Sequence, residues 1–285
     1  MDSLKYYNYA HKPFVDKVIY YDSKFIDRDR KAVMKNFTVD ENIGLIIKKR
    51  HNDKLYNHIF VSSSMVDKNF LGGQSYIFPL WINRTDAEVM HDAYDKRKRY
   101  SNLNVKFETL LESTYNKKNI TEQIFYYIYA VLYSKTYRAS FPEQLQIDYP
   151  KIPITKDVKV FEQLSALGKE LSDLHLLKSI KLNKPQVKFQ GLGNGKVENA
   201  IYDKNRNVIT INGTQFFDNI GQSLWDYEIG KNRVIQQWIK NKEKIEFEDA
   251  VEFGKIATAI YETFNLQIEI DKIYPEILTE LIEKQ

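Results

Sequence analysis

The sequence contains no cysteine, which excludes a disulfide framework and any metal site built on thiolates. No apolar run reaches the length of a membrane span, and the opening residues, MDSLKYYNYAHKPF, lack the apolar core of a secretion signal. Neither a membrane-spanning helix nor a secreted protein is therefore expected. We expect a cytoplasmic location by default.

Proline is scarce, and its spacing excludes one catalytic loop. The seven prolines are never adjacent. The Asn/Asp-Pro-Pro-aromatic loop with which amino-methyltransferases hold the target amino group therefore cannot form. Residues 189–193, FQGLG, imitate the glycine-rich cofactor turn of those enzymes. That turn should open a helix, whereas a second strand pattern follows here, so we interpret the segment as a hairpin loop.

Other catalytic signatures are missing as well. The five histidines show no HExxH or other paired metal spacing, and no GxSxG or GxxxxGK[ST] motif occurs. The sequence thus predicts no metal site and no catalytic residue. One alternative stays open. Asp16, Asp22 and Lys24 form an Asp…Asp-x-Lys pattern, which in a small nuclease would hold Mg²⁺ and support an attacking water.

Aromatic residues, by contrast, are abundant. The 285 residues include 20 Tyr and 16 Phe, and 43% are hydrophobic, so a folded protein with a substantial core is expected. The net charge of +4 conceals an asymmetry. Residues 1–242 hold 38 Lys and Arg against 27 Asp and Glu, whereas residues 243–285 hold 4 against 11. A basic body with an acidic end favours a polyanionic partner for the first part.

The order of the hydrophobic patterns predicts an α+β fold in three parts. These parts are a β-rich N-terminal lobe over 1–120, a helical connector over 121–185, and a small antiparallel sheet with C-terminal helices over 186–285. Within them the patterns place strands near 18–21, 43–47, 59–61, 76–78, 187–189, 196–202 and 208–211, a polar surface excursion over 94–119, and helices over 121–140, 158–177, 223–241 and 247–268.

Residues 60–80, FVSSSMVDKNFLGGQSYIFPL, place short polar side chains between two strand patterns. Ser, Asp, Asn and Gln side chains on a strand-anchored loop can meet the edges of base pairs in the major groove at little entropic cost. Neighbouring lysines and arginines can hold phosphates. The plainer alternative is a loop whose serines cap a strand end and whose glycines form an ordinary turn.

Several further segments join this stretch in one pattern. They are YAHKPFVD (9–16) with Tyr20-Tyr21, QIFYYIYAVLYSKTYR (123–138), DYPKIPI (148–154), LGKELSDLHLL (167–177), INGTQFF (211–217), WDYEIG (225–230) and WIK (238–240). Together, in this order and over nearly the whole chain, they resemble the C-terminal target-recognition (specificity) domain of single-polypeptide restriction–modification enzymes of the type ISP and type IIG kind. The likeness departs at Lys12, Lys151 and residues 231–233.

In that family the domain follows an N6-adenine methyltransferase domain, and longer members add a nuclease and an ATP-driven translocase. The resemblance implies that this chain is one target-recognition domain that reads double-stranded DNA without catalysis of its own. Its partners would be the methyltransferase and endonuclease domains of the same enzyme, whether the chain is a fragment or a separate protein. The chain itself would need no cofactor, whereas the parent enzyme would use S-adenosylmethionine and Mg²⁺.

The resemblance and the side-chain chemistry together suggest the contacts. Asp67 would accept from a cytosine amino group, Asn69 or Gln74 would pair with adenine, and Arg50 with guanine. The full set of expected base contacts is Arg50, His51, Asn52, Ser63, Ser64, Asp67, Lys68, Asn69 and Gln74. The expected phosphate contacts are Lys24, Arg28, Arg30, Lys48 and Lys49, with Lys96, Arg97, Lys98 and Arg99 as a flanking clamp.

A third hypothesis is a docking module. The helix pattern at 121–140 carries Tyr126, Tyr127 and Tyr129. If these rings formed an exposed surface, they would bind a methyltransferase, and contact with DNA would be incidental.

Overall fold

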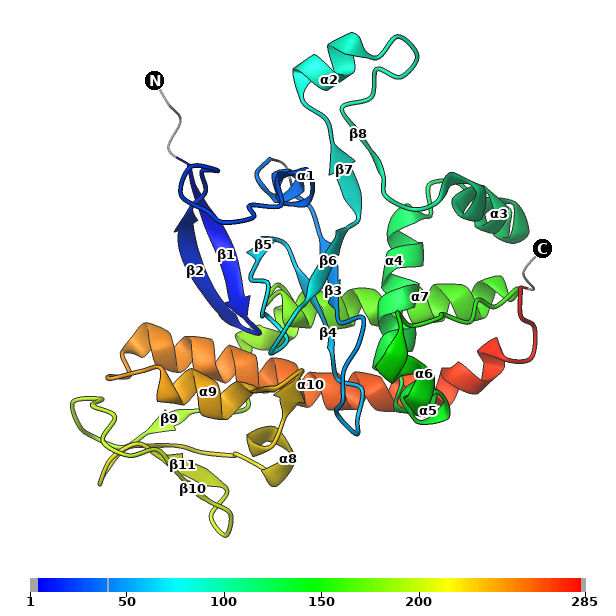
Figure 1. The fold of residues 1–285 in the computed structure, drawn as a ribbon. Coiled ribbons are helices and arrows are strands. Elements are labelled where there is room, and N and C mark those ends of the chain that lie inside the picture. Colours follow the sequence, from blue (N-terminus) through cyan, green and yellow to red (C-terminus); the bar gives the residue numbers. More distant parts are fainter. Residues whose placement is uncertain (1–4, 40, 283–285) are drawn as a thin grey trace.

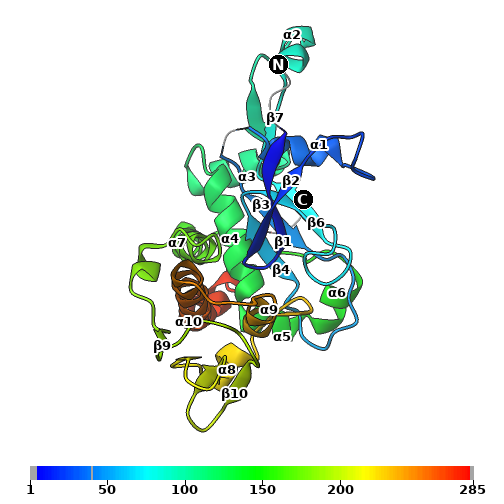
Figure 2. The ribbon, with the colours of Figure 1, turned by 90° about the vertical axis from the view of Figure 1, so that its left-hand side faces the viewer.

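Two long helices run side by side through the molecule (Figures 1 and 2). In the view of Figure 1 the N-terminal strands lie above them and the small C-terminal sheet lies below. The helices are α7 (Val158–His175) and α10 (Phe247–Ile277). This computed structural model describes residues 5–39 and 41–282.

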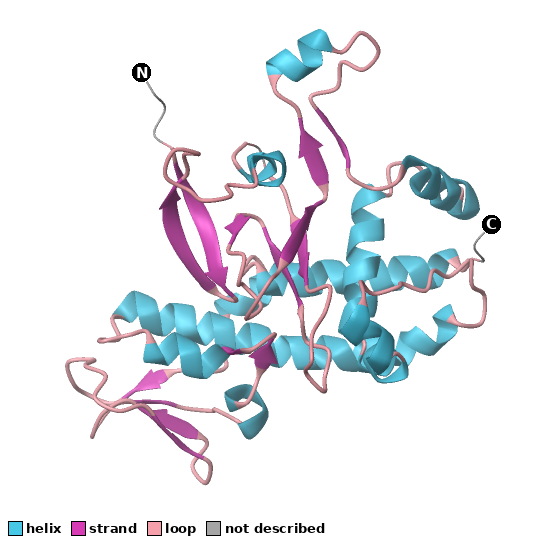
Figure 3. Cartoon of the chain, viewed as in Figure 1, coloured by secondary structure: helices cyan, strands magenta, loops and turns pink. Residues whose placement is uncertain are grey.

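Short strands build the N-terminal lobe (Figure 3). β1 and β2 form an antiparallel hairpin, and β5 runs parallel to β1, while β3 lies between β4 and β6 and is antiparallel to both. The strands expected near 18–21, 43–47, 59–61 and 76–78 are confirmed. The bounds are β1 (Tyr6–Lys12), β2 (Val15–Tyr20), β3 (Gly44–Ile47), β4 (Ile59–Ser62), β5 (Met65–Val66) and β6 (Tyr76–Pro79). α1 (Lys31–Met34) and η1 (Lys35–Phe37) precede β3.

A hairpin arm extends from this lobe (Figure 1). It consists of β7 (Trp81–Asn83), α2 (Asp86–His91) and β8 (Arg99–Ser101). The polar surface excursion expected over 94–119 contains a helix that was not predicted, α3 (Val105–Tyr115), which follows the arm. Asn104 begins this helix by accepting from the N–H groups of Lys106 and Phe107, and Asn116 ends it in a left-handed conformation. Only Leu111 and Tyr115 of α3 are buried, too few to reveal the helix in the sequence.

The helix expected over 121–140 is two helices. Ser134 has extended backbone (ψ 123°), and its hydroxyl oxygen accepts from the N–H of Tyr137, which begins a new helix. The N-cap of the first helix is Ile120. The helices of this part are α4 (Thr121–Tyr133), α5 (Lys135–Ser140), α6 (Pro142–Ile147) and α7, followed by η2 (Ile180–Asn183).

The C-terminal part also departs from the expected helix over 223–241. A two-residue turn at Gly230-Lys231 joins β13 to β14 and divides that segment. The sheet order β10-β11-β12-β9 includes a strand that periodicity did not predict, β12. The bounds are β9 (Phe189–Gln190), β10 (Ile201–Asp203), β11 (Val208–Thr210), β12 (Phe216–Phe217), α8 (Gln222–Trp225), β13 (Glu228–Ile229), β14 (Asn232–Arg233) and α9 (Val234–Lys240).

Two apolar clusters hold these parts together. One joins α3, α4, α5, α7 and the second half of α10 to Ile59 and Leu80, while the other joins the C-terminal sheet, α9 and the first half of α10 to Ile46 and Phe60. Each cluster therefore draws on more than one of the three parts expected from the sequence, and that division stays a prediction. The α+β class is confirmed. None of the helices in the described residues combines the length and the hydropathy that a membrane span requires.

Candidate nucleic-acid interface

Two loops leave the same end of the β4–β3–β6 sheet. The register pairs Ile47, the last residue of β3, with Tyr76, the first residue of β6, and with Ile59, the first residue of β4. The start of the segment that follows β3 therefore lies beside the end of the loop that leads into β6. They are segment 48–58 and loop 67–75, which contain most of the base contacts expected from the sequence.

Loop 67–75 is closed by its own hydrogen bonds. The N–H of Ser75 donates to the carbonyl of Lys68 at 2.7 Å, and the N–H of Asn69 donates to the Asp67 carboxylate at 2.6 Å. Because the two ends of the loop are joined, its backbone has less conformational entropy to lose when a ligand binds. The side chains of Lys68, Asn69 and Gln74 are exposed.

Loop 67–75 also has supports that sequence patterns do not reveal. Phe70 and Leu71 are buried beneath it, at 1% and 0% exposure. From the side, the amide of Asn232 donates to the Phe70 carbonyl at 2.9 Å, and the N–H of Lys231 donates to the Leu71 carbonyl at 3.3 Å. Gly230 allows this approach, because its φ is +58° and a Cβ there would lie 2.3 Å from the Leu71 oxygen. Residues 230–232 thus brace the loop from a distant part of the chain.

Asp67 contributes to the loop as a structural carboxylate. It accepts from the hydroxyl of Tyr9 at 2.8 Å as well as from the N–H of Asn69. Burial, and then the hydrogen bond to Asp67, raise the pKa of Tyr9. The expected contact of Asp67 with cytosine therefore competes with two hydrogen bonds that the carboxylate already accepts.

We expect Asp67→Ala to lower the free energy of unfolding by about 1–3 kcal/mol, because it leaves the Tyr9 hydroxyl and the Asn69 N–H without their acceptor. Urea unfolding followed by fluorescence measures this. Asp67→Asn is the matched control, since its amide oxygen can still accept from Asn69, and it should lose much less. Equal stability of the Ala variant and the wild type would show that the carboxylate does not hold the loop.

The serines of the 60–80 stretch cap the end of a strand, which was the plainer of the two alternatives that the sequence offered. The N–H of Ser64 donates to the Ser62 hydroxyl at 3.0 Å, so these serines form a turn at the end of β4. Ser62–Ser64 line a cleft of about 150 Å³ together with Asp16 and Glu252. Burial, and then the charge of Glu252, raise the pKa of Asp16. Asp16 and Glu252 beside Ser63 and Ser64 disfavour the approach of a phosphate, whereas Lys12 lines the same cleft, and the expected base contacts of these serines stay predictions.

Segment 48–58 divides its side chains between the surface and the interior. Arg50 and Asn52 are exposed, and Lys49 lies over the ring of Tyr149 at 5.3 Å. The ring of His51, by contrast, is buried at 7% exposure and stacks on His58 with 4.3 Å between ring centroids. Burial lowers the pKa of His51. His51 was expected to contact a base, and this burial removes it from the surface.

Lys48 is likewise not a surface cation. Its exposure is 6%, and its ammonium donates to the carbonyl of Gly72 at 2.9 Å. Burial lowers the pKa of Lys48, and the nearby charge of Lys231 lowers it further. The expected phosphate contact is replaced by a bond that joins segment 48–58 to loop 67–75. Lys231, which is exposed, supplies the cation beside the loop instead.

An aromatic group beside these loops was not expected. The ring of Tyr149 packs edge-on against Tyr76 at 5.8 Å and against Phe78 at 5.6 Å, and Phe78 is 40% exposed. The amide of Gln74 donates to the Tyr76 hydroxyl at 2.6 Å. These rings continue the surface of loop 67–75 towards Lys49, and their separation in the sequence concealed them.

The expected phosphate contacts near the N-terminus lie at the other end of the sheet. Lys24, Arg28 and Arg30 precede α1 and η1 and are exposed. η1 adjoins the start of β3, where a Cβ on Gly44 would lie 2.8 Å from the Phe37 ring. Arg28 stands 3.8 Å from Asp27. The structure therefore does not bring these three cations together with loop 67–75.

The arm pairs most of the clamp residues internally. Arg97 binds the Asp95 carboxylate at 2.8 Å, Lys98 lies 2.9 Å from Asp86, and Arg99 stacks on Trp81 at 4.8 Å. Lys96 is exposed, and its ammonium donates to the carbonyls of Val89 and Met90 at 3.3 Å. Carboxylates of the arm thus offset part of the expected positive field.

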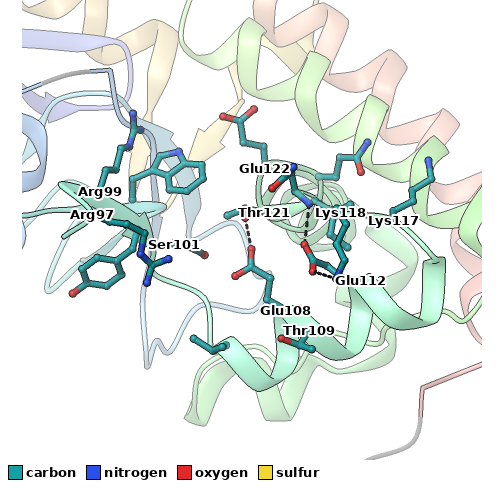
Figure 4. A pocket seen from close by; sticks show the side chains of 16 residues that line it. Arg97, Arg99, Ser101, Glu108, Thr109, Glu112, Lys117, Lys118, Thr121 and Glu122 are labelled. Carbon is teal, nitrogen blue, oxygen red and sulfur yellow. Dashed lines mark hydrogen bonds and ion pairs between the residues drawn. The ribbon is translucent and has the colours of Figure 1, made fainter. Parts of the chain in front are cut away.

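Between the arm and α3 lies a cleft of about 880 Å³ (Figure 4). Arg97 and Arg99 reach it from β8 and the residues before it, while Glu108 and Glu112 face it from α3. Lys118 bonds Glu112 at 2.9 Å across one wall. The mixed charge of this lining does not favour a polyanion.

A comparison with known protein families decides what kind of domain this is. The model of the Type ISP C-terminal specificity domain matches residues 2–253. The chain belongs to this family. Membership indicates a recognition role for the specificity domain rather than a catalytic one. No curated protein sequence matched the chain.

Solved structures share the fold of the specificity domain. A nuclease-deletion mutant of the Type ISP restriction-modification enzyme LlaGI, in complex with a DNA substrate mimic, is 19% identical over 99% of this chain (TM-score 0.68). The ATP-dependent Type ISP enzyme LlaBIII bound to DNA is 21% identical over 100% (TM-score 0.71), and DrdV in its DNA complex is 16% identical over 97% (TM-score 0.69). The chain spans 25%, 19% and 28% of those three chains.

The structure argues against the nuclease alternative for the specificity domain. Asp16 pairs with Ala10 at one end of the β1–β2 hairpin, whereas Asp22 follows the other end, where Tyr20 pairs with Tyr6. Six residues of extended chain span about 20 Å, and carboxylates that share one Mg²⁺ must each reach it within about 2.1 Å. Asp22 instead binds Lys5 at 2.7 Å. Asp16, Asp22 and Lys24 are not assembled into a site.

The structure also lacks, among its described residues, the exposed surface of three tyrosine rings on which the docking alternative depends. Tyr127 and Tyr129 have 0% exposure, and their hydroxyls bond the Pro153 carbonyl at 2.8 Å and His175 at 2.6 Å. Tyr126 is half-buried, and the ammonium of Lys169 lies 5.9 Å from its ring. Two of the three rings thus belong to the core of the specificity domain.

Proposed function

We propose that this chain is the part of a restriction–modification enzyme that reads the sequence of double-stranded DNA. One observation carries the proposal: a member of a specificity-domain family displays exposed amide side chains on a braced loop beside exposed cations. Base edges are read by such donors and acceptors, while cations on either side hold the phosphates and set the register.

We propose a narrower set of roles than the one expected from the sequence. Asn69 and Gln74 project from loop 67–75 and would pair with adenine, and Arg50 would pair with guanine. Lys68 is exposed on the same loop. Lys49 and Lys231 would contact phosphates at its edges. Ser63, Ser64, His51 and Lys48 are left out because they face carboxylates or lie inside the protein.

Selection from a random duplex library, followed by binding of the chosen sequence, tests this function. We expect Asn69→Ala or Gln74→Ala to relax the preference at one base pair and to weaken binding of the selected site by about 1–3 kcal/mol, roughly fivefold to 150-fold. Asn205→Ala is the matched control, because Asn205 is an exposed amide in the turn between β10 and β11.

The same measurements include the result that would oppose the proposal. Wild-type binding should weaken steeply as salt is raised, because phosphate contacts release counterions. If the wild type selects no sequence, or if both loop variants select the same sequence with the same affinity as Asn205→Ala, loop 67–75 does not read DNA.

The enzyme around this domain is part of the proposal. It would be a site-specific adenine DNA methyltransferase and endonuclease that uses S-adenosylmethionine and Mg²⁺ and acts in the cytoplasm. Its catalytic domains would be the partners of this chain. The support is that the three solved relatives are much longer chains, two of which are restriction-modification enzymes of Type ISP. In that enzyme, Asn69→Ala should change which adenines are methylated without changing the affinity for S-adenosylmethionine.

A further inference from the structure

Segment 48–58 concentrates buried polar atoms that lack partners. Thirteen such side-chain atoms occur in the described part of the chain, and seven of them belong to residues 51–58. Five of the seven are the ring nitrogens of His51 and His58 and one carboxylate oxygen, Oδ2, of Asp53. A buried polar atom without a partner is costly, so this cluster calls for a group that would satisfy it.

The three side chains converge on one place. Their nearest ligand atoms all lie within 4.8 Å of one another. His58 has 0% exposure and His51 has 7%, whereas the side chain of Asp53 is 36% exposed and opens the place to solvent. Nε2 of His58 lies 2.9 Å from Oδ2 of Asp53 but without the alignment of a hydrogen bond. Two imidazoles and a carboxylate whose ligand atoms lie this close together can supply the donor set of a cation, although His58 and Asp53 are already close enough to form an ion pair.

We propose that His51, Asp53 and His58 bind a divalent transition metal ion, with Zn²⁺ as the best-matched species. Imidazole nitrogen with one carboxylate oxygen suits Zn²⁺ and its neighbours, whereas Mg²⁺ prefers oxygen donors alone. Zinc bonds of about 2.0–2.2 Å require the two imidazoles to turn towards each other from their stacked position. The exposed side of Asp53 leaves a fourth position for water.

Most of the groups around the three ligands favour a bound cation. One nearby charge, that of Lys48, opposes it. The backbone carbonyls of Asp53 and Leu145 lie near the His51 ring, where acceptors commonly orient a metal-bound imidazole. The charge of Lys48 also acts on both rings and opposes a cation. Its ammonium, however, donates to the Gly72 carbonyl at 2.9 Å and stays directed at loop 67–75.

The ion would join the two ends of segment 51–58, which lies beside α6. Other bonds already hold this segment there: the N–H of His51 donates to the Gln146 carbonyl at 3.1 Å, and the Gln146 amide donates to the Asp53 carbonyl at 3.2 Å. Arg50 and Asn52 flank His51, so the ion would order Arg50, which is assigned to DNA above, and Asn52, which was expected to contact a base. This effect on DNA rests on the proposed function, whereas the metal site itself does not.

Metal binding is tested on the full, untagged chain. The protein is treated with a chelator, dialysed, and titrated with Zn²⁺ by calorimetry and with Co²⁺ by visible absorption. The wild type should bind one equivalent and show the absorption of a low-coordinate Co²⁺ site. Asp53→Asn and His58→Gln should each weaken binding by more than about tenfold. His91→Gln is the matched control, because His91 is exposed on α2, and it should bind as the wild type does.

Each outcome decides the proposal. Absence of one-equivalent binding in the wild type overturns it, and so does binding that Asp53→Asn leaves intact. Should His58→Gln fail to fold, Asp53→Asn still decides, since its side chain is partly exposed and nearly unchanged in shape. Duplex binding is then measured with and without Zn²⁺. Metal binding without any duplex binding would contradict the proposed function and leave the metal site standing.

Discussion

Replacing Gly168 with alanine is expected to lower the free energy of unfolding by about 3 kcal/mol, the upper range for overpacking a core. Gly168 lies in the middle of α7, where α7 crosses α4. A Cβ at this position would lie 1.9 Å from the carbonyl oxygen of Tyr126 and 2.7 Å from its carbon. Both atoms are backbone, so no side chain can rotate away, and the two helices must separate.

The sign of this effect distinguishes packing from local preference. Inside a free helix, alanine is favoured over glycine by about 1 kcal/mol, so helix propensity alone predicts that Gly168→Ala stabilises the protein. The contact with α4 predicts the opposite. Nearby, the hydroxyl of Ser165 donates to the Gln123 carbonyl at 2.9 Å, and this bond between the two helices would be strained as well.

Urea unfolding of Gly168→Ala measures the loss. Gly213→Ala is the matched control, because nothing lies within 4 Å of a Cβ placed there. It should change stability by less than about 0.5 kcal/mol. If Gly168→Ala proves as stable as the wild type, α4 and α7 do not meet at backbone contact.

Acidification is expected to destabilise the protein through His175, by about 3 kcal/mol between pH 6.5 and pH 4. The ring is 3% exposed, with Nδ1 2.6 Å from the Tyr129 hydroxyl and Nε2 3.0 Å from the Thr263 hydroxyl. Burial, and then the charge of Arg138, lower the pKa of His175 to about 3.

The sign follows from proton binding. Between about pH 6.5, the ordinary pKa of histidine, and pH 3, the unfolded chain binds a proton at His175 that the folded chain does not. Protons therefore favour the unfolded state in this window. The stability is fully present above pH 6.5 and is lost as the pH falls towards 3.

Stability measured by urea at a series of pH values tests this. His175→Gln can still bond Tyr129 and Thr263 but cannot titrate, so its stability should fall less steeply below pH 6.5, by on the order of 1.4 kcal/mol per pH unit. His91→Gln, which removes an exposed histidine, should keep the wild-type slope. Identical slopes for His175→Gln and the wild type would show that His175 is not held neutral by the fold.

Long and strongly periodic segments were predictable from the sequence. The helix expected over 158–177 is α7, and the one expected over 247–268 is the first two thirds of α10, because repeated apolar residues at helical spacing leave little choice of structure. The expected strands of the N-terminal lobe are present for the same reason, at a spacing of two. Short elements were not predicted. α3 buries two residues, and the β13–β14 hairpin depends on Gly230 and on a partner, Leu71, that is far away in the sequence.

The candidate nucleic-acid interface was also only partly predictable from the sequence. The sequence located its two loops, because polar side chains between strand patterns are visible in the order of the residues. It did not separate Asn69 and Gln74, which face outward, from His51 and Lys48, which face inward. Within a loop, no periodicity tells which side chain the rest of the protein covers.

What the sequence determined by itself is the class of the fold, the family and the absence of thiolate chemistry, because these depend on composition, periodicity and the order of motifs. The tertiary structure decided which polar groups remain at the surface, and it brought His51, Asp53 and His58 to one point. The first result depends on contacts between residues far apart along the chain, and the second on how a short segment is held against α6 by such contacts. Such contacts arise only when helices and strands pack, and they leave no spacing that can be read beforehand.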